Sequence, residues 1–190
     1  MKIGAQLYTV REYTKDLKSL AETLKKVADI GYDSVQLSAT CAFEAEWMAE
    51  QLKKNGLVCA VTHSDPNRIL REPDKVAKEH KIFGCEYIGI GCAPNSFKNG
   101  YEDYLDFKEK FTEAARNLRT CGVTFAYHNH HMEFTRIVGE NNERTIFEIM
   151  AEDFGDDITF ILDTYWVQYA GADPAEYIEA LTGRDRKSVV

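Results

Sequence analysis

The chain has 190 residues, of which 44% are hydrophobic and 28% are charged, and its formal net charge at pH 7 is −8. This composition is typical of a globular domain with one sizeable core. The negative charge argues against a nucleic-acid ligand, which normally requires a basic surface, and no apolar run approaches the roughly 20 residues of a membrane span. We therefore expect a cytoplasmic protein that acts on a small molecule and binds neither nucleic acid nor membrane.

The chain opens directly with a strand-like segment, residues 1–8, and shows no signal-peptide pattern. Side chains alternate between the two faces of a strand. One face of this first strand is therefore apolar, and the other is small or polar and carries Gly4, Gln6 and Tyr8.

Five further units follow the same plan, in which a helix ends in a glycine and a short β-branched or aromatic strand comes next. Glycine suits the left-handed conformation just past a helix C-terminus. The predicted strands cover residues 34–38, 58–63, 86–91, 123–128 and 158–163. Strands that alternate with helices in this way predict a parallel sheet. The five cysteines contain no C-x-x-C pair and indicate reduced thiols rather than a disulfide or zinc framework.

The two faces of the predicted strands differ in polarity. In an open, doubly wound sheet both faces would be apolar because helices cover both. One apolar face and one small or polar face instead favour the wall and lumen of a barrel. A complete (β/α)₈ barrel takes roughly 250 residues, and about six βα units are present here. We predict an α/β fold with one domain, an incomplete TIM barrel over residues 1–184, followed by a short polar tail at 185–190.

Ionisable residues crowd the ends of the fifth and sixth predicted strands, in FAYHNHHMEF (125–134) and ITFILDTYW (158–166). Alternation places His128 and His130 on one face of the fifth strand and Asp163 on the matching face of the sixth. The carboxyl ends of barrel strands are where such folds place their chemistry. We therefore expect these three side chains to converge on one cavity.

Other ionisable residues have plainer interpretations. His63 ends the third strand, where a site role and a turn role are equally compatible with the sequence. The pattern places His80 on a helix face and gives His131 a structural role. Asp163 has the alternative role of capping the next helix, and Glu133 the alternative of a solvent-facing loop carboxylate.

Three segments, IGAQLYTVRE, HNHHMEF and LDTYWVQYAGADPAEYI, together resemble the xylose isomerase-like sugar phosphate isomerase/epimerase family of TIM barrels. That family includes ketose epimerases, inosose dehydratases and hydroxypyruvate isomerases, and it holds a divalent metal with a glutamate, an aspartate, a histidine and a second glutamate. The resemblance implies that Glu133 and Asp163 are metal ligands. The histidine and the second glutamate would come from a seventh and an eighth strand, which this sequence does not contain.

The chain departs from the family pattern at two places. In the epimerase branch a glutamate stands at the strand end, where this chain has His128, and the nearest carboxylate, Glu133, follows five residues later, as in the dehydratase-like branch. The family also continues into a strand that carries a histidine, whereas this chain runs into RDRKSVV.

The resemblance implies a metal-dependent sugar or sugar phosphate isomerase or epimerase. A divalent cation (manganese, cobalt, zinc or magnesium) would stabilise an enediolate, with Glu133 as the catalytic carboxylate. A sugar or cyclitol substrate would be bound by residues at the strand ends: Gln6, Tyr8, His63, His128, His130 and Trp166.

Several alternatives remain open from the sequence. A keto-sugar or inosose dehydratase passes through the same enediolate, and a chain without the late strands would be a poorly active or inactive sugar-binding fragment. A metal-dependent nuclease related to endonuclease IV is disfavoured by the acidic charge balance. A homo-oligomer is compatible with the family.

Overall fold

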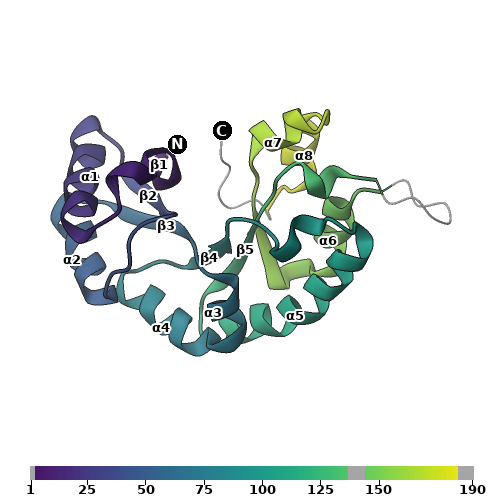
Figure 1. Cartoon of the computed structure of the whole chain (residues 1–190), viewed down its shortest axis with the longest axis horizontal. Helices are drawn as coiled ribbons and strands as arrows, with labels where there is room; N and C mark the ends of the chain where they lie inside the picture. Colours follow the sequence, from purple (N-terminus) through teal and green to yellow (C-terminus); the bar gives the residue numbers. More distant parts are fainter. Residues whose placement is uncertain (1–2, 137–143, 184–190) are drawn as a thin grey trace.

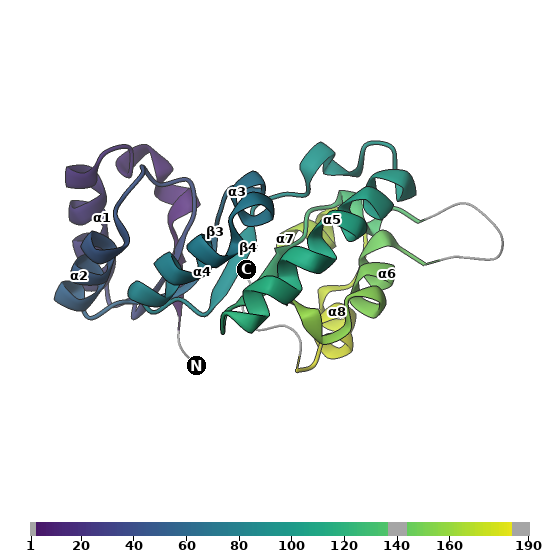
Figure 2. The same cartoon turned by 90° about the horizontal axis from the view of Figure 1, so that it is seen from below.

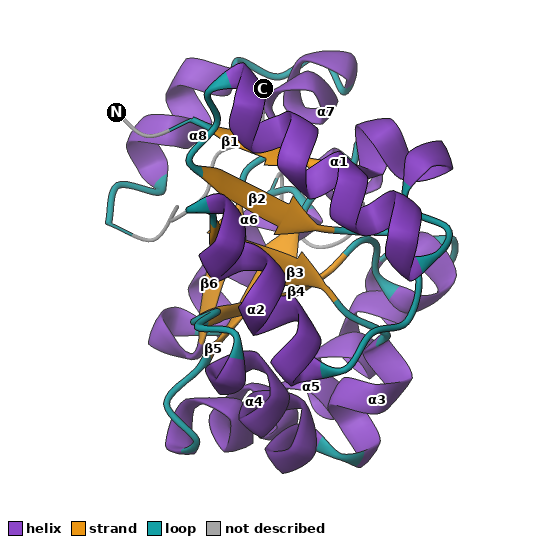
Figure 3. Ribbon diagram, turned by 90° about the vertical axis from the view of Figure 1, so that its left-hand side faces the viewer, coloured by secondary structure: helices purple, strands orange, loops and turns teal. Residues whose placement is uncertain are grey.

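The computed structural model describes residues 3–136 and 144–183, in which all six strands form one parallel sheet in the order β1-β2-β3-β4-β5-β6. Figures 1 and 3 show the strands on the inside of a curved arc and the helices around its outside. The strands are β1 (Gly4–Gln6), β2 (Ser34–Leu37), β3 (Val58–His63), β4 (Tyr87–Ile90), β5 (Thr124–His128) and β6 (Ile158–Ile161). This is the incomplete barrel that the sequence predicts. The predicted tail at 185–190 lies outside the described residues.

The helices follow the strands along the chain, and Figure 2 shows α4, α5 and α6 along the outer side of the arc. The α-helices are α1 (Leu17–Ile30), α2 (Ala45–Asn55), α3 (Pro66–Arg71), α4 (Pro73–Ile82), α5 (Tyr101–Thr120), α6 (Ile146–Asp153), α7 (Thr164–Tyr169) and α8 (Pro174–Ala180). Short 3₁₀ segments are η1 (Leu7–Tyr13), η2 (Pro94–Phe97), η3 (Met132–Phe134) and η4 (Gly155–Asp157). None of the described helices is long and apolar enough to cross a membrane.

The helix ends carry the expected local signals. Asp16 accepts a hydrogen bond from the backbone N–H of Ser19 and so begins α1 with a capping box. Gly31 ends α1 with a φ of 111°, a conformation that a residue with a Cβ rarely adopts. Pro73 and Pro174 occupy the first turns of α4 and α8, where the missing N–H of proline breaks no helical hydrogen bond.

The two faces of the sheet differ as the sequence predicts. Outward side chains such as Val35, Ile88 and Phe125 are buried in the layer between sheet and helices. The inner face holds a small separate cluster formed by Val61, Ala126 and Ile161. A Cβ at Gly89 would lie 2.8 Å from the carbonyl oxygen of Thr62, so this inward position requires glycine.

Two details of the sequence prediction are wrong. The first strand ends at Gln6 rather than at residue 8, and Tyr8 lies in η1. The hydroxyl of Thr9 donates to the carbonyl of Gln6 and stabilises the early turn. Apolar residues at helical spacing predict that Leu17 and Leu105 are buried, but these side chains are 43% and 45% exposed. Leu17 is the first residue of α1 and Leu105 is the fifth residue of α5, and both lie on the solvent side of the buried stripe.

Candidate functional site

The predicted site residues lie at the carboxyl ends of the strands. Gln6, His63 and His128 are the last residues of β1, β3 and β5, and Asp163 follows β6 by two residues. The parallel pairing of β5 with β6 sets His128 opposite Ile161. His128 Nε2 then lies 3.7 Å from Asp163 Oδ2, so the predicted convergence of these two residues is present in the structure.

Three histidine rings and one indole ring lie next to one another across the strand ends. The ring centroids of His63 and His128 are 5.0 Å apart, as are those of His128 and His130 and those of His130 and Trp166. His131 lies against Trp166 and Tyr169 at the rim. We call His63, His128, His130, Asp163 and Trp166 the strand-end cluster.

Asp163 is held in place from both sides. Its Oδ1 accepts a hydrogen bond of 3.3 Å from the backbone N–H of Trp166 and caps α7. The buried side chain of Asn129 accepts from the backbone N–H of Asp163 at 2.8 Å and donates to its carbonyl at 3.2 Å. The capping role and the inward placement therefore coexist. Burial raises the pKa of Asp163.

Sequence reasoning did not identify Asn129 as a positioning residue. Its side chain joins the end of β5 to the residue after β6, and it is completely buried. The only signal in the sequence was a polar residue between two inward histidines.

His63 is held by two polar side chains of β2 and the residue after it. The amide nitrogen of Gln36 lies 2.8 Å from His63 Nε2, and Ser38 Oγ lies 3.0 Å from His63 Nδ1. Because the amide nitrogen is a donor, Nε2 accepts and Nδ1–H donates to Ser38. Burial and then the charge of His130 lower the pKa of His63 to about 4, so the ring is neutral and both nitrogens are occupied.

His128 and His130 each present a buried nitrogen without a partner. Among the described residues, Nδ1 of His128 and Nδ1 of His130 are the buried side-chain nitrogen or oxygen atoms that make no hydrogen bond. Burial, followed by the charges of His63 and His130, lowers the pKa of His128 to about 2. Unpaired buried polar atoms are uncommon and often mark functional positions.

Glu133 occupies a different environment from Asp163. Its Oε1 accepts a 2.5 Å hydrogen bond from the hydroxyl of Tyr127, and its Oε2 accepts a 2.9 Å bond from the backbone N–H of His130. The residue is 0% exposed, so the alternative of a solvent-facing loop carboxylate is wrong. Burial raises its pKa. Tyr127 is an outward residue that packs on Phe107, so Glu133 faces the layer between sheet and helices.

Tyr8 and Gln6 each contact a residue of η1, and neither of these contacts involves the strand-end cluster. Tyr8 is 50% exposed, and the guanidinium carbon of Arg11 lies 4.4 Å from the centroid of its ring. The backbone carbonyl of Gln6 accepts from Thr9. Their predicted roles in substrate binding stay predictions.

Comparison with known proteins now decides the family. The profile of the xylose isomerase-like TIM barrel family matches residues 24–190, most of the chain. The chain belongs to this family. No curated protein matches it by sequence.

Solved structures share the fold of this xylose isomerase-like barrel at low sequence identity. A sugar phosphate isomerase/epimerase from Parabacteroides distasonis has a TM-score of 0.79 and 21% identity, with 97% of this chain and 72% of that chain covered. An AP endonuclease, family 2, from Brucella melitensis has a TM-score of 0.71 and 16% identity, with 97% and 77% covered. An L-ribulose 3-epimerase has a TM-score of 0.68 and 15% identity, with 97% and 68% covered.

The divalent metal that the family implies can be tested against the donors of this xylose isomerase-like chain. The imidazole of His128 and the carboxylate of Asp163 form a mixed nitrogen and oxygen pair, which suits manganese, cobalt or zinc. Within residues 3–136 and 144–183, no three histidine, cysteine, aspartate or glutamate side chains are grouped closely enough to hold an ion. The described residues therefore fit part of a metal shell.

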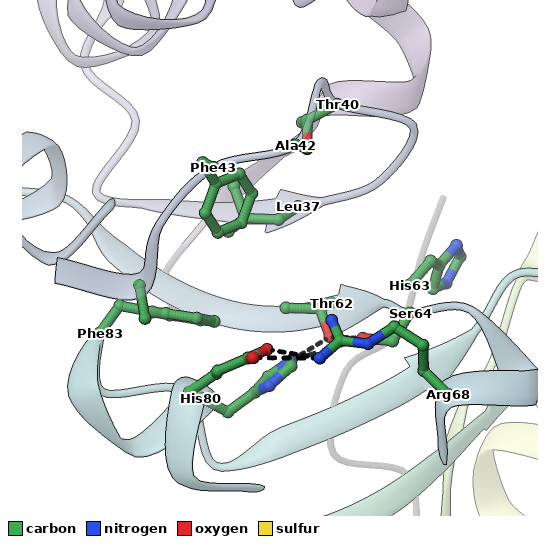
Figure 4. Close-up of a pocket in the computed structure, with 12 residues that line it drawn as sticks. Leu37, Thr40, Ala42, Phe43, Thr62, His63, Ser64, Arg68, His80 and Phe83 are labelled. Carbon is green, nitrogen blue, oxygen red and sulfur yellow. Dashed lines mark hydrogen bonds and ion pairs between the residues drawn. The ribbon is translucent and has the colours of Figure 1, made fainter. Parts of the chain in front are cut away.

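A separate cavity of about 190 Å³ lies on the helix side of β3. Figure 4 shows Thr62, Arg68 and His80 around it, whereas the ring of His63 points away from them. His80 Nδ1–H donates to the carbonyl of Val76 at 2.7 Å, so its Nε2 accepts from the hydroxyl of Thr62 at 2.8 Å. The sequence placed His80 on a helix face, and that face is buried.

We expect His80 to make the barrel sensitive to acid. Burial lowers its pKa to about 4, below the value near 6.5 in an unfolded chain. The contribution of His80 to the free energy of unfolding is therefore complete above pH 6.5. It is lost as the pH falls toward 4, because in this range the unfolded state binds the proton and the folded state does not. The loss amounts to about 3 kcal/mol.

Urea unfolding between pH 7.5 and 4 measures this loss. His80→Gln should flatten the pH dependence of the free energy of unfolding by about 3 kcal/mol relative to the unmodified protein. Thr62→Val removes the hydrogen bond but keeps the buried imidazole, so its pH dependence should stay steep. Parallel curves for His80→Gln and the unmodified protein would show that His80 does not cause the sensitivity.

Proposed function

We propose that this protein is a metal-dependent isomerase or epimerase that acts on a sugar or sugar phosphate through proton transfer next to a carbonyl. The observation that carries the proposal is the pairing of Asp163 with neutral, buried imidazoles at the carboxyl ends of a xylose isomerase-like barrel. The isomerase/epimerase name of the similar Parabacteroides distasonis protein supports the reaction class.

The residues of the strand-end cluster suit a small polyhydroxylated substrate. The unpaired nitrogens of His128 and His130 are hydrogen-bonding groups for substrate oxygens. The half-buried indole of Trp166 offers an apolar face at the rim. The carboxylate of Asp163 lies beside the ring of His128. A bound divalent cation would supply Lewis-acid stabilisation of the enediolate. The assignment of Glu133 as the catalytic carboxylate and second metal ligand rests on the family resemblance alone and on no contact of Glu133 in the structure.

A keto-sugar or inosose dehydratase is the second candidate. The position of Glu133, five residues past the end of β5 rather than at it, favours this branch. The two reactions share proton removal and differ in whether a β-hydroxyl then leaves as water. We also propose that the protein binds no nucleic acid, in keeping with its net charge of −8.

Hydrogen exchange tests the proposal directly. The protein, incubated with Mn²⁺ and a panel of ketoses, keto-cyclitols and their phosphates in D₂O, should replace the proton α to the carbonyl with deuterium. The NMR signal of that proton measures the rate. Asp163→Asn should slow the exchange, whereas Asp173→Asn, which changes the exposed cap of α8, should not.

The reaction products distinguish an isomerase or epimerase from a dehydratase. Exchange with interconverted sugars supports the isomerase or epimerase, and exchange with loss of water supports the dehydratase. If saturation-transfer NMR detects sugar binding but no proton exchange occurs, the result would indicate a sugar-binding protein without enzymatic activity. Neither binding nor exchange with any member of the panel would contradict the proposed function.

A further inference from the structure

The two carboxylates assigned to metal binding by family resemblance do not share one environment. Asp163 lies at the inner strand ends, beside His128. Glu133 is turned toward Tyr127, on the helix side of the sheet. We propose that His128, rather than Glu133, is the side chain that shares the divalent cation with Asp163, and that Glu133 is a positioning residue. This inference rests on the proposed function only in requiring that a divalent cation binds.

The distance between His128 and Asp163 fits a shared ion. Imidazole nitrogens and carboxylate oxygens bind zinc-like cations at about 2.1 Å, so two donors on one ion lie at most about 4.2 Å apart. The observed Nε2–Oδ2 distance is 3.7 Å. That separation is too long for a hydrogen bond, so the two groups do not already satisfy each other.

Both donors are held before any ion arrives. Asn129 fixes the backbone of Asp163 through two hydrogen bonds, and the cap of α7 orients its carboxylate. The ring of His128 lies between those of His63 and His130. His63 is itself fixed by Gln36 and Ser38. Because these side chains are held in place, an ion would require little further ordering of the protein.

The surroundings of His128 also suit a ligand. The ring is 4% exposed, and its Nδ1 has no partner within the described residues.

Glu133 has the opposite properties. Both of its oxygens accept hydrogen bonds, and the 2.5 Å bond from Tyr127 is short, as expected for a donor to a charged acceptor. To reach an ion beside Asp163, it would lose both bonds and leave the hydroxyl of Tyr127 unpaired in the core. Its contacts instead tie the turn at 130–134 to β5, which sets the direction of His130.

Mn²⁺ binding distinguishes the two assignments without any activity measurement. We compare the unmodified protein with His128→Gln, Glu133→Gln and the control His131→Gln, an exposed histidine of the same segment. Calorimetry gives the Mn²⁺ affinity. Electron spin-echo modulation shows whether a ¹⁴N nucleus of an imidazole is bound to the ion.

We expect His128→Gln to weaken Mn²⁺ binding more than about 100-fold, beyond the 10–100-fold typical of residues that only support a ligand, and to remove the ¹⁴N modulation. His131→Gln should bind as the unmodified protein does. Glu133→Gln should keep the ¹⁴N modulation and lose no more than the 10–100-fold in affinity typical of a supporting residue, with a lower unfolding temperature. Tyr127→Phe, which removes one partner of Glu133 and no proposed ligand, should likewise lower the unfolding temperature and keep the affinity.

Two results would overturn the inference. One is a folded Glu133→Gln variant, by circular dichroism, that no longer binds Mn²⁺; the other is His128→Gln with unchanged affinity and ¹⁴N modulation. If the unmodified protein binds neither Mn²⁺ nor Co²⁺, the metal dependence in the proposed function fails as well. Binding that depends on Glu133 alone refutes this inference and leaves the proposed function standing.

Discussion

Asp163→Asn is expected to weaken divalent-metal binding more than about 100-fold and to reduce α-proton exchange by at least the same factor. Removing a supporting residue from a metal site typically costs 10–100-fold, and removing a charged ligand should cost more. Asparagine is chosen because it is also a good helix cap. It can still accept the hydrogen bond from the backbone N–H of Trp166 that begins α7.

The matched control for this variant is Asp173→Asn. Asp173 caps α8 by accepting a hydrogen bond of 2.9 Å from the backbone N–H of Ala175, at an exposed position. It should change neither metal affinity nor exchange. Metal analysis and calorimetry on both variants provide the measurement. If Asp163→Asn bound metal as tightly as the Asp173 control, Asp163 would be removed from the proposed ligand set.

Asn129→Ala is expected to destabilise the protein by about 2–6 kcal/mol and to weaken metal binding as a consequence. Its side chain satisfies both the N–H and the carbonyl of Asp163, and all of these groups are buried. Each buried backbone group left without a partner costs about 1–3 kcal/mol. The residue that carries the proposed ligand would also lose its link to β5.

Urea unfolding at pH 7.5 measures the loss, and two variants calibrate it. Asn55→Ala removes one hydrogen bond, from Asn55 Nδ2 to the carbonyl of Gln51 at the partly buried end of α2, and should cost about 1 kcal/mol. Asn129→Asp keeps the acceptor for the N–H of Asp163 but places an acceptor against its carbonyl, so it should be at least as damaging as alanine. A loss for Asn129→Ala no larger than that of Asn55→Ala would show that the link is not required.

The sequence determined the architecture because the signals for it are local. Glycine at 31, 56 and 122 marks the left-handed ends of helices, and the alternation of side chains marks which face of each strand is buried. These signals predicted six parallel strands and an inner face lined by residues such as Ala126 and Ile161. The same alternation placed His128 and Asp163 together. A match over residues 24–190 then confirmed the family.

The surroundings of each candidate side chain were decided by tertiary structure. Alternation applies only within a strand, so it gave no direction for Glu133, which lies five residues past β5 and is oriented by the hydroxyl of Tyr127. It also failed for Tyr8, because the chain turns into η1 after Gln6. The link from Asn129 to Asp163 joins residues 34 positions apart. Such a contact depends on the register of β5 against β6, which no local pattern encodes.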